Sequence, residues 1–200
     1  MFSHIVTSRI CKWRIFPTIL LKIVLAGDGA VGKTSLRERY LGRGFKSNYL
    51  ATIGADFAIA DRTIEGKEIK FQIWDLAGQP QFSAVRGVYY ANCLGALQVF
   101  DVTRPDSLTN LNSWIHEFWN NNGRGAMPFI ILGNKTDLRD QFPHSIPQKK
   151  VDSFVEEWND KTQGKGFQVT YLDTSAKTGL NVDIAFELLG KAVLDYIESQ

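Results

Sequence analysis

The sequence predicts an α/β fold: a six-stranded, mostly parallel sheet with one antiparallel edge strand and helices on both faces. Three observations predict it. Short apolar runs alternate with stretches of helical periodicity, so helices should join strands that pair in parallel. Two runs are instead separated by the turn Glu65-Gly66, which predicts a hairpin and one antiparallel strand. Polar residues follow several runs, and in such sheets ligands bind at the carboxyl ends of the strands.

The strands are expected where apolar residues are continuous. The first run, ILLKIVLA, ends at Gly27 and is typical of a buried strand. The expected strands cover residues 19–26, 55–63, 67–75, 94–101, 128–134 and 167–173. The expected helices cover residues 33–41, 107–120, 147–159 and 181–198. Residues 42–52 are polar and contain glycine, so we expect a loop there.

Length and composition indicate one domain. The chain has 200 residues, 44% of them apolar and 22% charged, which is enough for a sizeable core. We expect the domain to cover residues 19–198, after an extension at 1–18. The two cysteines, Cys11 and Cys93, are too few for a disulfide framework and favour a reducing, cytoplasmic compartment. No uncharged apolar run reaches about 18 residues, so no spanning helix is expected.

The charge is distributed unevenly. The net charge is +2, but residues 1–27 hold no acidic residue and four basic ones, namely Arg9, Lys12, Arg14 and Lys22. Subtracting these 4 from 23 basic residues leaves 19 against 21 acidic residues, so residues 28–200 carry about −2. A nucleic-acid-binding domain usually shows a basic stripe in its body. We therefore expect no nucleic-acid partner.

The first expected strand ends in a phosphate-binding sequence. Residues 27–34, GDGAVGKT, fit the pattern G-x-x-x-x-G-K-[ST] at every defined position. The glycines let backbone N–H groups surround an anion, and the following helix adds its positive N-terminal end. Lys33 can supply charge to the outer phosphates, and Thr34 a hydroxyl to Mg²⁺. The alternative is a plain glycine turn, but the flanking strand and helix favour a P-loop NTPase, a three-layer sandwich.

A second motif, WDLAGQ, ends the strand expected at 67–75. Asp75 is placed to hold a metal ion, usually through water, and Gly78 to offer its N–H to a terminal phosphate. Gln79 can orient an attacking water. An aspartate at a strand end is by itself more often a turn residue, so this interpretation depends on the phosphate-binding loop.

Two further motifs suit a guanine base. In the NKTD sequence at 134–137, Asp137 can accept hydrogen bonds from both N1–H and the amino group of guanine, which adenine cannot offer. The aliphatic stem of Lys135 can lie on the purine face. The SAK sequence at 175–177 can present a backbone N–H to guanine O6. Either motif alone also fits an ordinary turn.

The four motifs, in this order and spacing, resemble those of the Ras superfamily of small GTPases, and especially of its Rab group. The sequences TIGADF at 52–57 and IWDLAGQ at 73–79 are similar to the two Rab switch signatures. The resemblance covers about residues 19–198. It implies a molecular switch that hydrolyses GTP to GDP and phosphate and cycles between an effector-binding GTP form and an inactive GDP form. It also implies a role in vesicle traffic or signalling.

The resemblance assigns roles to single residues. It implies that Thr52 joins Mg²⁺ through its hydroxyl and the γ-phosphate through its N–H, and that Gln79 is the catalytic residue. Phe45 would stack against guanine, and Gly29 would leave the transition state uncrowded. The expected metal-binding residues are Thr34, Thr52 and Asp75 (through water), and the expected effector surface is Phe57, Trp74 and Tyr89. The expected nucleotide-binding residues are Gly29, Ala30, Val31, Gly32, Lys33, Thr34, Ser35, Phe45, Thr52, Gly78, Asn134, Lys135, Asp137, Ser175, Ala176 and Lys177.

The same resemblance implies ligands and partners. The ligands are GTP, GDP and Mg²⁺, and the partners of a monomeric chain are effector proteins, an exchange factor and a GTPase-activating protein. No motif identifies an arginine finger within the chain. Hydrolysis by the chain alone is therefore expected to be slow and to be stimulated by the activating protein.

Pro80 departs from the family, which usually carries a glutamate there that assists nucleotide exchange. Proline removes a backbone donor and stiffens the chain. Pro80 therefore favours a second interpretation, a scaffold that binds guanine nucleotide without switching, which the intact Gly29, Thr52 and Gln79 disfavour. A third interpretation is a P-loop ATPase or nucleotide kinase, and Asp137 argues against it.

The two ends of the sequence also differ from the family. It ends at residues 198–200, ESQ, without a terminal cysteine, so prenylation is not expected. In residues 1–18 an apolar side interrupted by Arg9 fits an interfacial helix that attaches the protein to a membrane surface. A transit peptide, or a plain extension from an upstream start codon, fits as well. The apolar residues are Phe2, Ile5, Val6, Ile10, Trp13 and Phe16, and Pro17 ends the pattern.

Overall fold

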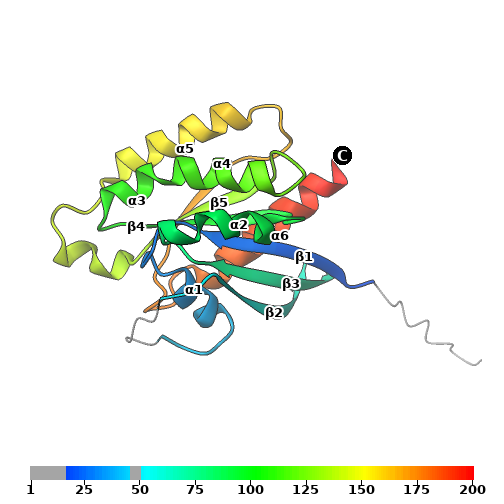
Figure 1. Ribbon diagram of the computed structural model, residues 1–200, viewed down its shortest axis with the longest axis horizontal. Helices are drawn as coiled ribbons and strands as arrows, with labels where there is room; N and C mark the ends of the chain where they lie inside the picture. Colours follow the sequence, from blue (N-terminus) through cyan, green and yellow to red (C-terminus); the bar gives the residue numbers. More distant parts are fainter. Residues whose placement is uncertain (1–16, 46–50) are drawn as a thin grey trace, which may run out of the picture.

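The computed structural model describes residues 17–45 and 51–200 (Figure 1). Its strands are β1 (Ile19–Ala26), β2 (Ala55–Ile64), β3 (Lys67–Leu76), β4 (Gly95–Asp101), β5 (Phe129–Asn134) and β6 (Thr170–Asp173). Its helices are α1 (Lys33–Tyr40), α2 (Ser83–Tyr90), α3 (Pro105–Thr109), α4 (Leu111–Asn121), α5 (Gln148–Thr162) and α6 (Val182–Glu198), with two 3₁₀ turns, η1 (Pro80–Phe82) and η2 (Thr136–Gln141). The apolar pattern of residues 2–16 lies outside the described residues.

The strands form one sheet in the order β2-β3-β1-β4-β5-β6. All neighbours are parallel except β2 and β3, which pair antiparallel. Glu65 and Gly66 join these two strands with φ of 50° and 76°. Positive φ at both central residues is the conformation that favours a tight hairpin turn. The predicted sheet with one antiparallel edge strand is confirmed.

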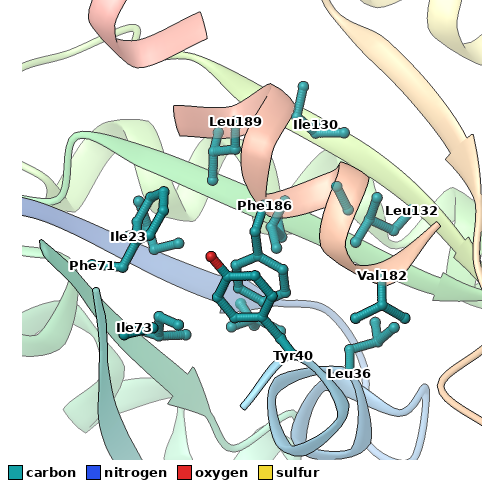
Figure 2. Packing of buried hydrophobic residues seen from close by; sticks show 14 of the residues in the cluster. Ile23, Leu36, Tyr40, Phe71, Ile73, Ile130, Leu132, Val182, Phe186 and Leu189 are labelled. Atoms are coloured by element: carbon teal, nitrogen blue, oxygen red, sulfur yellow. The ribbon is translucent and has the colours of Figure 1, made fainter. Parts of the chain in front are cut away.

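Helices cover both faces of the sheet, which gives three layers (Figure 1). Helices α1 and α6 pack on one face, where Tyr40 and Phe186 stack with ring centroids 3.8 Å apart (Figure 2). A Cβ atom at Gly190 would lie 2.5 Å from Ile64 Cδ1, so the glycine lets α6 approach the sheet closely. Helices α2, α3, α4 and α5 cover the other face, over a second core that includes the buried Trp158.

Two expected elements differ from the structure, and one helix of the structure is absent from the prediction. The helix expected at 107–120 is divided into α3 and α4 at Asn110, whose side-chain amide donates to Asp28 Oδ2 at 2.8 Å. The strand expected at 167–173 begins only at Thr170, because the Asn159 side chain bonds the backbone N–H and C=O of Val169. Helix α2 was not expected, since its sequence SAVRGVYY contains a glycine and has no capping residue.

The topology brings the sequence motifs together. Strands β1, β3, β4, β5 and β6 run parallel, so their carboxyl ends lie at the same edge of the sheet. The loops that follow β1, β3, β5 and β6 contain the four motifs. They therefore meet at one place although they span residues 27 to 177.

Candidate nucleotide site

The phosphate-binding loop has a backbone that requires glycine at two points. Gly27 has φ +137°, and a Cβ atom there would lie 2.1 Å from the carbonyl oxygen of Val99. Gly32 has φ +99°, and its Cβ atom would lie 2.3 Å from Asn134 Nδ2. The loop is thereby packed against β4 and β5, and it directs the start of α1 toward the pocket. Backbone N–H groups at a helix start have no partner within the helix and can bind an anion.

Lys33 lies across this loop. Its Nζ donates to the carbonyl oxygens of Gly27 and Asp28, at 2.6 and 2.8 Å. The side chain is buried, and burial lowers the pKa of the ammonium to about 8, although the carboxylates of Asp75 and Asp28 oppose the change. A cation with so little solvation is suited to binding phosphate oxygens.

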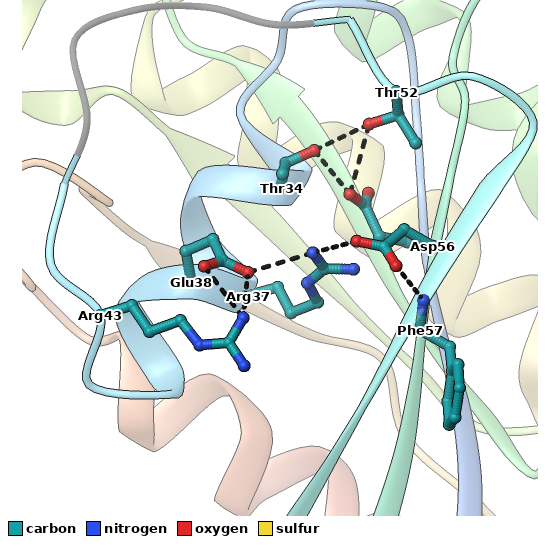
Figure 3. Close-up of polar contacts among 8 residues, drawn as sticks. Thr34, Arg37, Glu38, Arg43, Thr52, Asp56 and Phe57 are labelled. Carbon is teal, nitrogen blue, oxygen red and sulfur yellow. Dashed lines mark hydrogen bonds and ion pairs between the residues drawn. The ribbon is translucent and has the colours of Figure 1, made fainter.

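Three oxygen-bearing side chains meet beside α1 (Figure 3). Thr34 Oγ1 donates to Asp75 Oδ2 at 2.5 Å, and Thr52 Oγ1 lies 3.0 Å from Thr34 Oγ1 and 3.4 Å from Asp75 Oδ2. Asp75 is buried, which raises the pKa of its carboxyl, whereas the Thr34 hydrogen bond and Lys33 act to lower it. Within the described ranges, Asp75 Oδ1 has no hydrogen-bond partner. Such oxygen donors are the ligands that Mg²⁺ prefers.

Gln79 lies beside the phosphate-binding loop. A Cβ atom at Gly29 would be 3.7 Å from Gln79 Cγ, and one at Gly78 would be 2.3 Å from the backbone nitrogen of Gly29. Gly78 thus allows close contact between the two loops. The buried Gln79 Oε1 has no hydrogen-bond partner among the residues that the structure describes. Pro80 begins η1, and Gln79 before it is extended, with φ −76° and ψ 141°.

Arg86 of α2 holds the backbone around Gln79. Its Nη1 donates to the carbonyl oxygen of Gln79 at 3.1 Å and to that of Ala77 at 3.4 Å. The guanidinium also forms two hydrogen bonds with Glu117 of α4, at 2.7 and 2.9 Å, and lies 4.3 Å from the ring centroid of Trp114. Arg86 belongs to none of the sequence motifs, so its role could not be predicted from the sequence.

The other end of the pocket presents Asp137. Ser175 Oγ donates to Asp137 Oδ1 at 2.6 Å, which orients the carboxylate. The amide of Asn134 bridges two loops: its Nδ2 donates to the Val31 carbonyl at 2.8 Å, and its Oδ1 accepts from the backbone N–H of Ala176 at 3.2 Å. The NKTD and SAK motifs and the phosphate-binding loop are therefore directly connected.

Lys135 connects the base end to β4. Its Nζ pairs with Asp101 Oδ2 at 2.7 Å, and its φ of +67° lies in the left-handed region. Burial raises the pKa of the Asp101 carboxyl, but its hydrogen bonds, led by that from Lys135, produce a net lowering of the pKa. The ion pair fixes the end of the lysine side chain and leaves its aliphatic stem beside the pocket.

These loops enclose a pocket of about 610 Å³. The expected residues that line it are Gly29, Ala30, Gly32, Lys33, Thr34, Ser35, Phe45, Thr52, Gly78, Gln79, Asn134, Lys135, Asp137, Ala176 and Lys177. Val31, Asp75 and Ser175 are expected residues outside this lining, and each contacts a lining residue. Four further residues line the pocket and are not among the predicted site residues: Glu38, Gly44, Leu76 and Leu138. Helical periodicity could have identified Glu38, which lies one turn after Thr34.

The three aromatic residues of the expected effector surface lie side by side. Phe57 is 51% exposed, and Trp74 and Tyr89 are half-buried. The Phe57 and Trp74 rings stack with centroids 5.3 Å apart, and the Trp74 and Tyr89 centroids are 5.4 Å apart. The three rings form a continuous patch over β2, β3 and α2.

A phosphate-binding loop, a group of oxygen donors suited to Mg²⁺, and a carboxylate suited to guanine define a P-loop protein that binds guanine nucleotides. The family model described as Ras family matches residues 22–195. The chain therefore belongs to the Ras family of small GTPases, in its Rab group. It is a GTP-binding switch that hydrolyses GTP and has a role in vesicle traffic, and effectors and regulators act on it.

Relatives of the chain are similar to it over more than four fifths of their own length. The chain is 36% identical to the Ras-related protein Rab7 of Drosophila melanogaster over 179 residues, which is 88% of this chain and 81% of that protein. It is 38% identical to the Ras-related protein RABG3c of Arabidopsis thaliana, with 88% and 83% covered. It is 35% identical to the Ypt/Rab-type GTPase ypt7 of Schizosaccharomyces pombe, with 90% and 85% covered.

Proposed function

We propose that the residues around the 610 Å³ pocket carry out the binding and hydrolysis of GTP. The supporting observation is the arrangement of its two ends. Thr34, Thr52 and Asp75 meet at one end, while Ser175 orients Asp137 at the other. A guanine nucleotide placed between them has its phosphates at the loop and its base at Asp137.

Mg²⁺ is the proposed metal, held by Thr34, Thr52 and, through water, Asp75. In the described part of the chain no three His, Cys, Asp or Glu side chains gather as a metal site. One carboxylate with hydroxyls and substrate phosphates is the usual donor set for Mg²⁺. When bound, Mg²⁺ neutralises charge on the phosphate oxygens.

Gln79 is the proposed catalytic residue. Its amide lies against Gly29, at the end of the loop that would receive the γ-phosphate. Its Oε1, which no described residue contacts by a hydrogen bond, can accept one from a water and hold that water in line with the γ-phosphate. Lys33 and the N–H groups at the start of α1 stabilise the charge on the phosphates.

The proposed partners follow from the same site. Effectors that distinguish the GTP form would bind the patch of Phe57, Trp74 and Tyr89, and an exchange factor and an activating protein would act on the switch segments around Thr52 and Gln79. We assign the domain to residues 19–198 of a monomer that works in the cytoplasm or, through its N-terminal segment, at a membrane surface. None of the helices in residues 17–45 and 51–200 combines the length and apolar character that crossing a bilayer requires.

The first test is to purify the chain, denature it, and identify the released nucleotide by ion-exchange chromatography. We expect close to one equivalent of GDP per chain, which reflects tight binding and past hydrolysis together. Mostly GTP would agree with the pocket but would favour a scaffold or a protein that depends on an outside activator. An adenine nucleotide would contradict the role of Asp137.

A further inference from the structure

Arg37 on α1 is buried, although arginine usually keeps its charge at the surface. Its side chain is 4% exposed, and its Nη2 donates to Asp56 Oδ2 at 2.6 Å and to Glu38 Oε1 at 3.0 Å (Figure 3). Within residues 17–45 and 51–200, the buried Nε and Nη1 of Arg37 have no acceptor. Burial disfavours the charge, but the hydrogen bond to Asp56, followed by the Asp75 charge, raises the pKa of the guanidinium.

The contacts of Arg37 and Glu38 connect residues on both sides of Thr52 to α1, the helix that begins at the phosphate-binding loop. Asp56 is at the start of β2, four residues after Thr52, and its Oδ1 also accepts the backbone N–H of Phe57 at 2.8 Å. On the other side, Glu38 accepts from Arg43 at 3.3 Å. Arg43, Glu38, Arg37 and Asp56 thus form a continuous series of alternating charges, which we call the α1 bracket.

The α1 bracket limits where Thr52 can move. The carbonyl oxygen of Gly54 accepts from the backbone N–H of Ala77 at 2.9 Å, so the chain is attached to the end of β3 two residues after Thr52. Asp56 attaches it to α1 two residues later. Thr52 therefore lies two residues before a segment that is anchored at both Gly54 and Asp56, and its Oγ1 is 3.0 Å from Thr34 Oγ1.

We propose that Arg37 is a positioning residue for Thr52. Its buried guanidinium holds the start of β2 against α1 and so keeps the Thr52 hydroxyl within reach of Thr34 and Asp75. The inference rests on the proposed role of the Thr52 hydroxyl toward Mg²⁺. Arg37 itself lines no part of the pocket and acts only through Asp56.

The test measures release of a fluorescent, non-hydrolysable GTP analogue from the full chain, with Mg²⁺ and with excess EDTA. We expect Asp56→Asn to speed release in Mg²⁺ by about tenfold, because a hydrogen bond to a buried charge is weakened. In EDTA the variant and the original chain should release the analogue at equal rates, since Thr52 acts through the metal. The matched control is Asp61→Asn, which removes an exposed pair with Lys70 on the same strand and should change neither rate.

Combination with Thr52→Ala separates positioning from general destabilisation. Thr52→Ala alone should speed release in Mg²⁺, and Asp56→Asn should add nothing to it. If the two effects multiply, or if Asp56→Asn speeds release equally in EDTA, the inference is wrong. The inference is also wrong if Thr52→Ala speeds release in Mg²⁺ while Asp56→Asn releases the analogue at the rate of the original chain. If Thr52→Ala itself leaves the Mg²⁺-dependent rate unchanged, the proposed role of Thr52 fails instead.

Two variants of Arg37 complete the test. Arg37→Lys keeps a charge that can reach Asp56 and should speed release less than Arg37→Met does. A circular dichroism spectrum and a cooperative unfolding transition check that each variant is folded. If Arg37→Met does not fold, Asp56→Asn and Arg37→Lys still decide the question. Both variants keep a long, positively charged side chain at position 37. The proposal is contradicted if Arg37→Lys and Asp56→Asn both release the analogue at the rate of the original chain.

Discussion

The indole Nε1 of Trp114 donates a hydrogen bond of 2.8 Å to the carboxylate of Asp28. The contact connects α4 to the phosphate-binding loop across 86 residues of sequence. The guanidinium of Arg86, which holds the Gln79 carbonyl, lies over the Trp114 ring. Trp114 therefore contacts both the phosphate-binding loop and the residue that positions Gln79.

Trp114→Phe should therefore weaken the loop. Phenylalanine keeps most of the apolar contact but leaves the Asp28 carboxylate, among the described residues, with only the hydrogen bond from Asn110. We expect a loss of about 2 kcal/mol in the free energy of unfolding, since the acceptor is charged. Nucleotide affinity should fall as well. Urea titration and equilibrium binding check this, with Trp119→Phe as control, because that indole donates to the neutral Met127 carbonyl.

Arg86→Met should slow hydrolysis more than it weakens nucleotide binding. The arginine holds the carbonyl oxygen of Gln79, and its loss also leaves the partly buried Glu117 unpaired. We expect the free energy of unfolding to fall by about 3 kcal/mol. Single-turnover phosphate release and GDP affinity, measured in parallel, check the prediction. The exposed Arg124→Met is the control, and equal losses of rate and affinity would contradict the positioning of Gln79 by Arg86.

Gln79→Leu should lower the rate of phosphate release by about 100-fold, because the attacking water loses its orienting group. Leucine has a similar size, so GDP and GTP affinities should change little. Gln81→Leu is the matched control, two residues away on the exposed side of η1. An unchanged rate in Gln79→Leu would mean that another group orients the water.

Nucleotide affinity should decrease above pH 8. The lowered pKa means that the nucleotide-free chain releases the Lys33 proton near pH 8, whereas bound phosphates favour the charged form. Binding above this pH therefore takes up a proton, and affinity falls by up to about tenfold per pH unit. Calorimetric titration in two buffers of different ionisation heat measures this uptake. We expect nearly one proton at pH 9 and little at pH 7; equal uptake at both would exclude Lys33 as the source.

Asp137→Asn should change base preference from guanine toward xanthine. The asparagine amide cannot accept both guanine donors, whereas it can donate to the O2 of xanthine. We expect GDP affinity to fall by at least about 100-fold. Competition between GDP and xanthosine diphosphate measures the change. Asp140→Asn, an exposed carboxylate in the same turn, is the control and should leave the preference for guanine unchanged.

The sequence predicted the fold well because its signals are local. Continuous apolar runs marked the strands, and the short turn at Glu65 and Gly66 marked the antiparallel pair. Helix α2 could not be predicted because its stability comes from packing. Arg86 and Tyr90 are its buried residues, and Arg86 contacts α4. A helix of that kind has no cap and no clear signal of its own.

The candidate site likewise has one part that local sequence signals predict and one part that they do not. Residues within motifs were predicted because a motif fixes both residue type and spacing. Residues that support the motifs could not be predicted, since their partners are distant in sequence. Arg37 and Asp56 are 19 residues apart, and Arg86 and Glu117 are 31 residues apart. Only the folded chain shows that these charges meet.

Pro80 has a consequence for the thermodynamics of switching. It stands at the first position of η1, where a backbone N–H has no partner within the turn, so it removes no hydrogen bond. It also confines Gln79 to extended backbone, which the glutamine already adopts. When the switch segment around Gln79 is released after hydrolysis, it gains less conformational entropy than it would with glutamate at position 80. The difference favours the ordered form by about 0.4–1 kcal/mol, so this GTPase remains closer to its ordered state after GTP is spent.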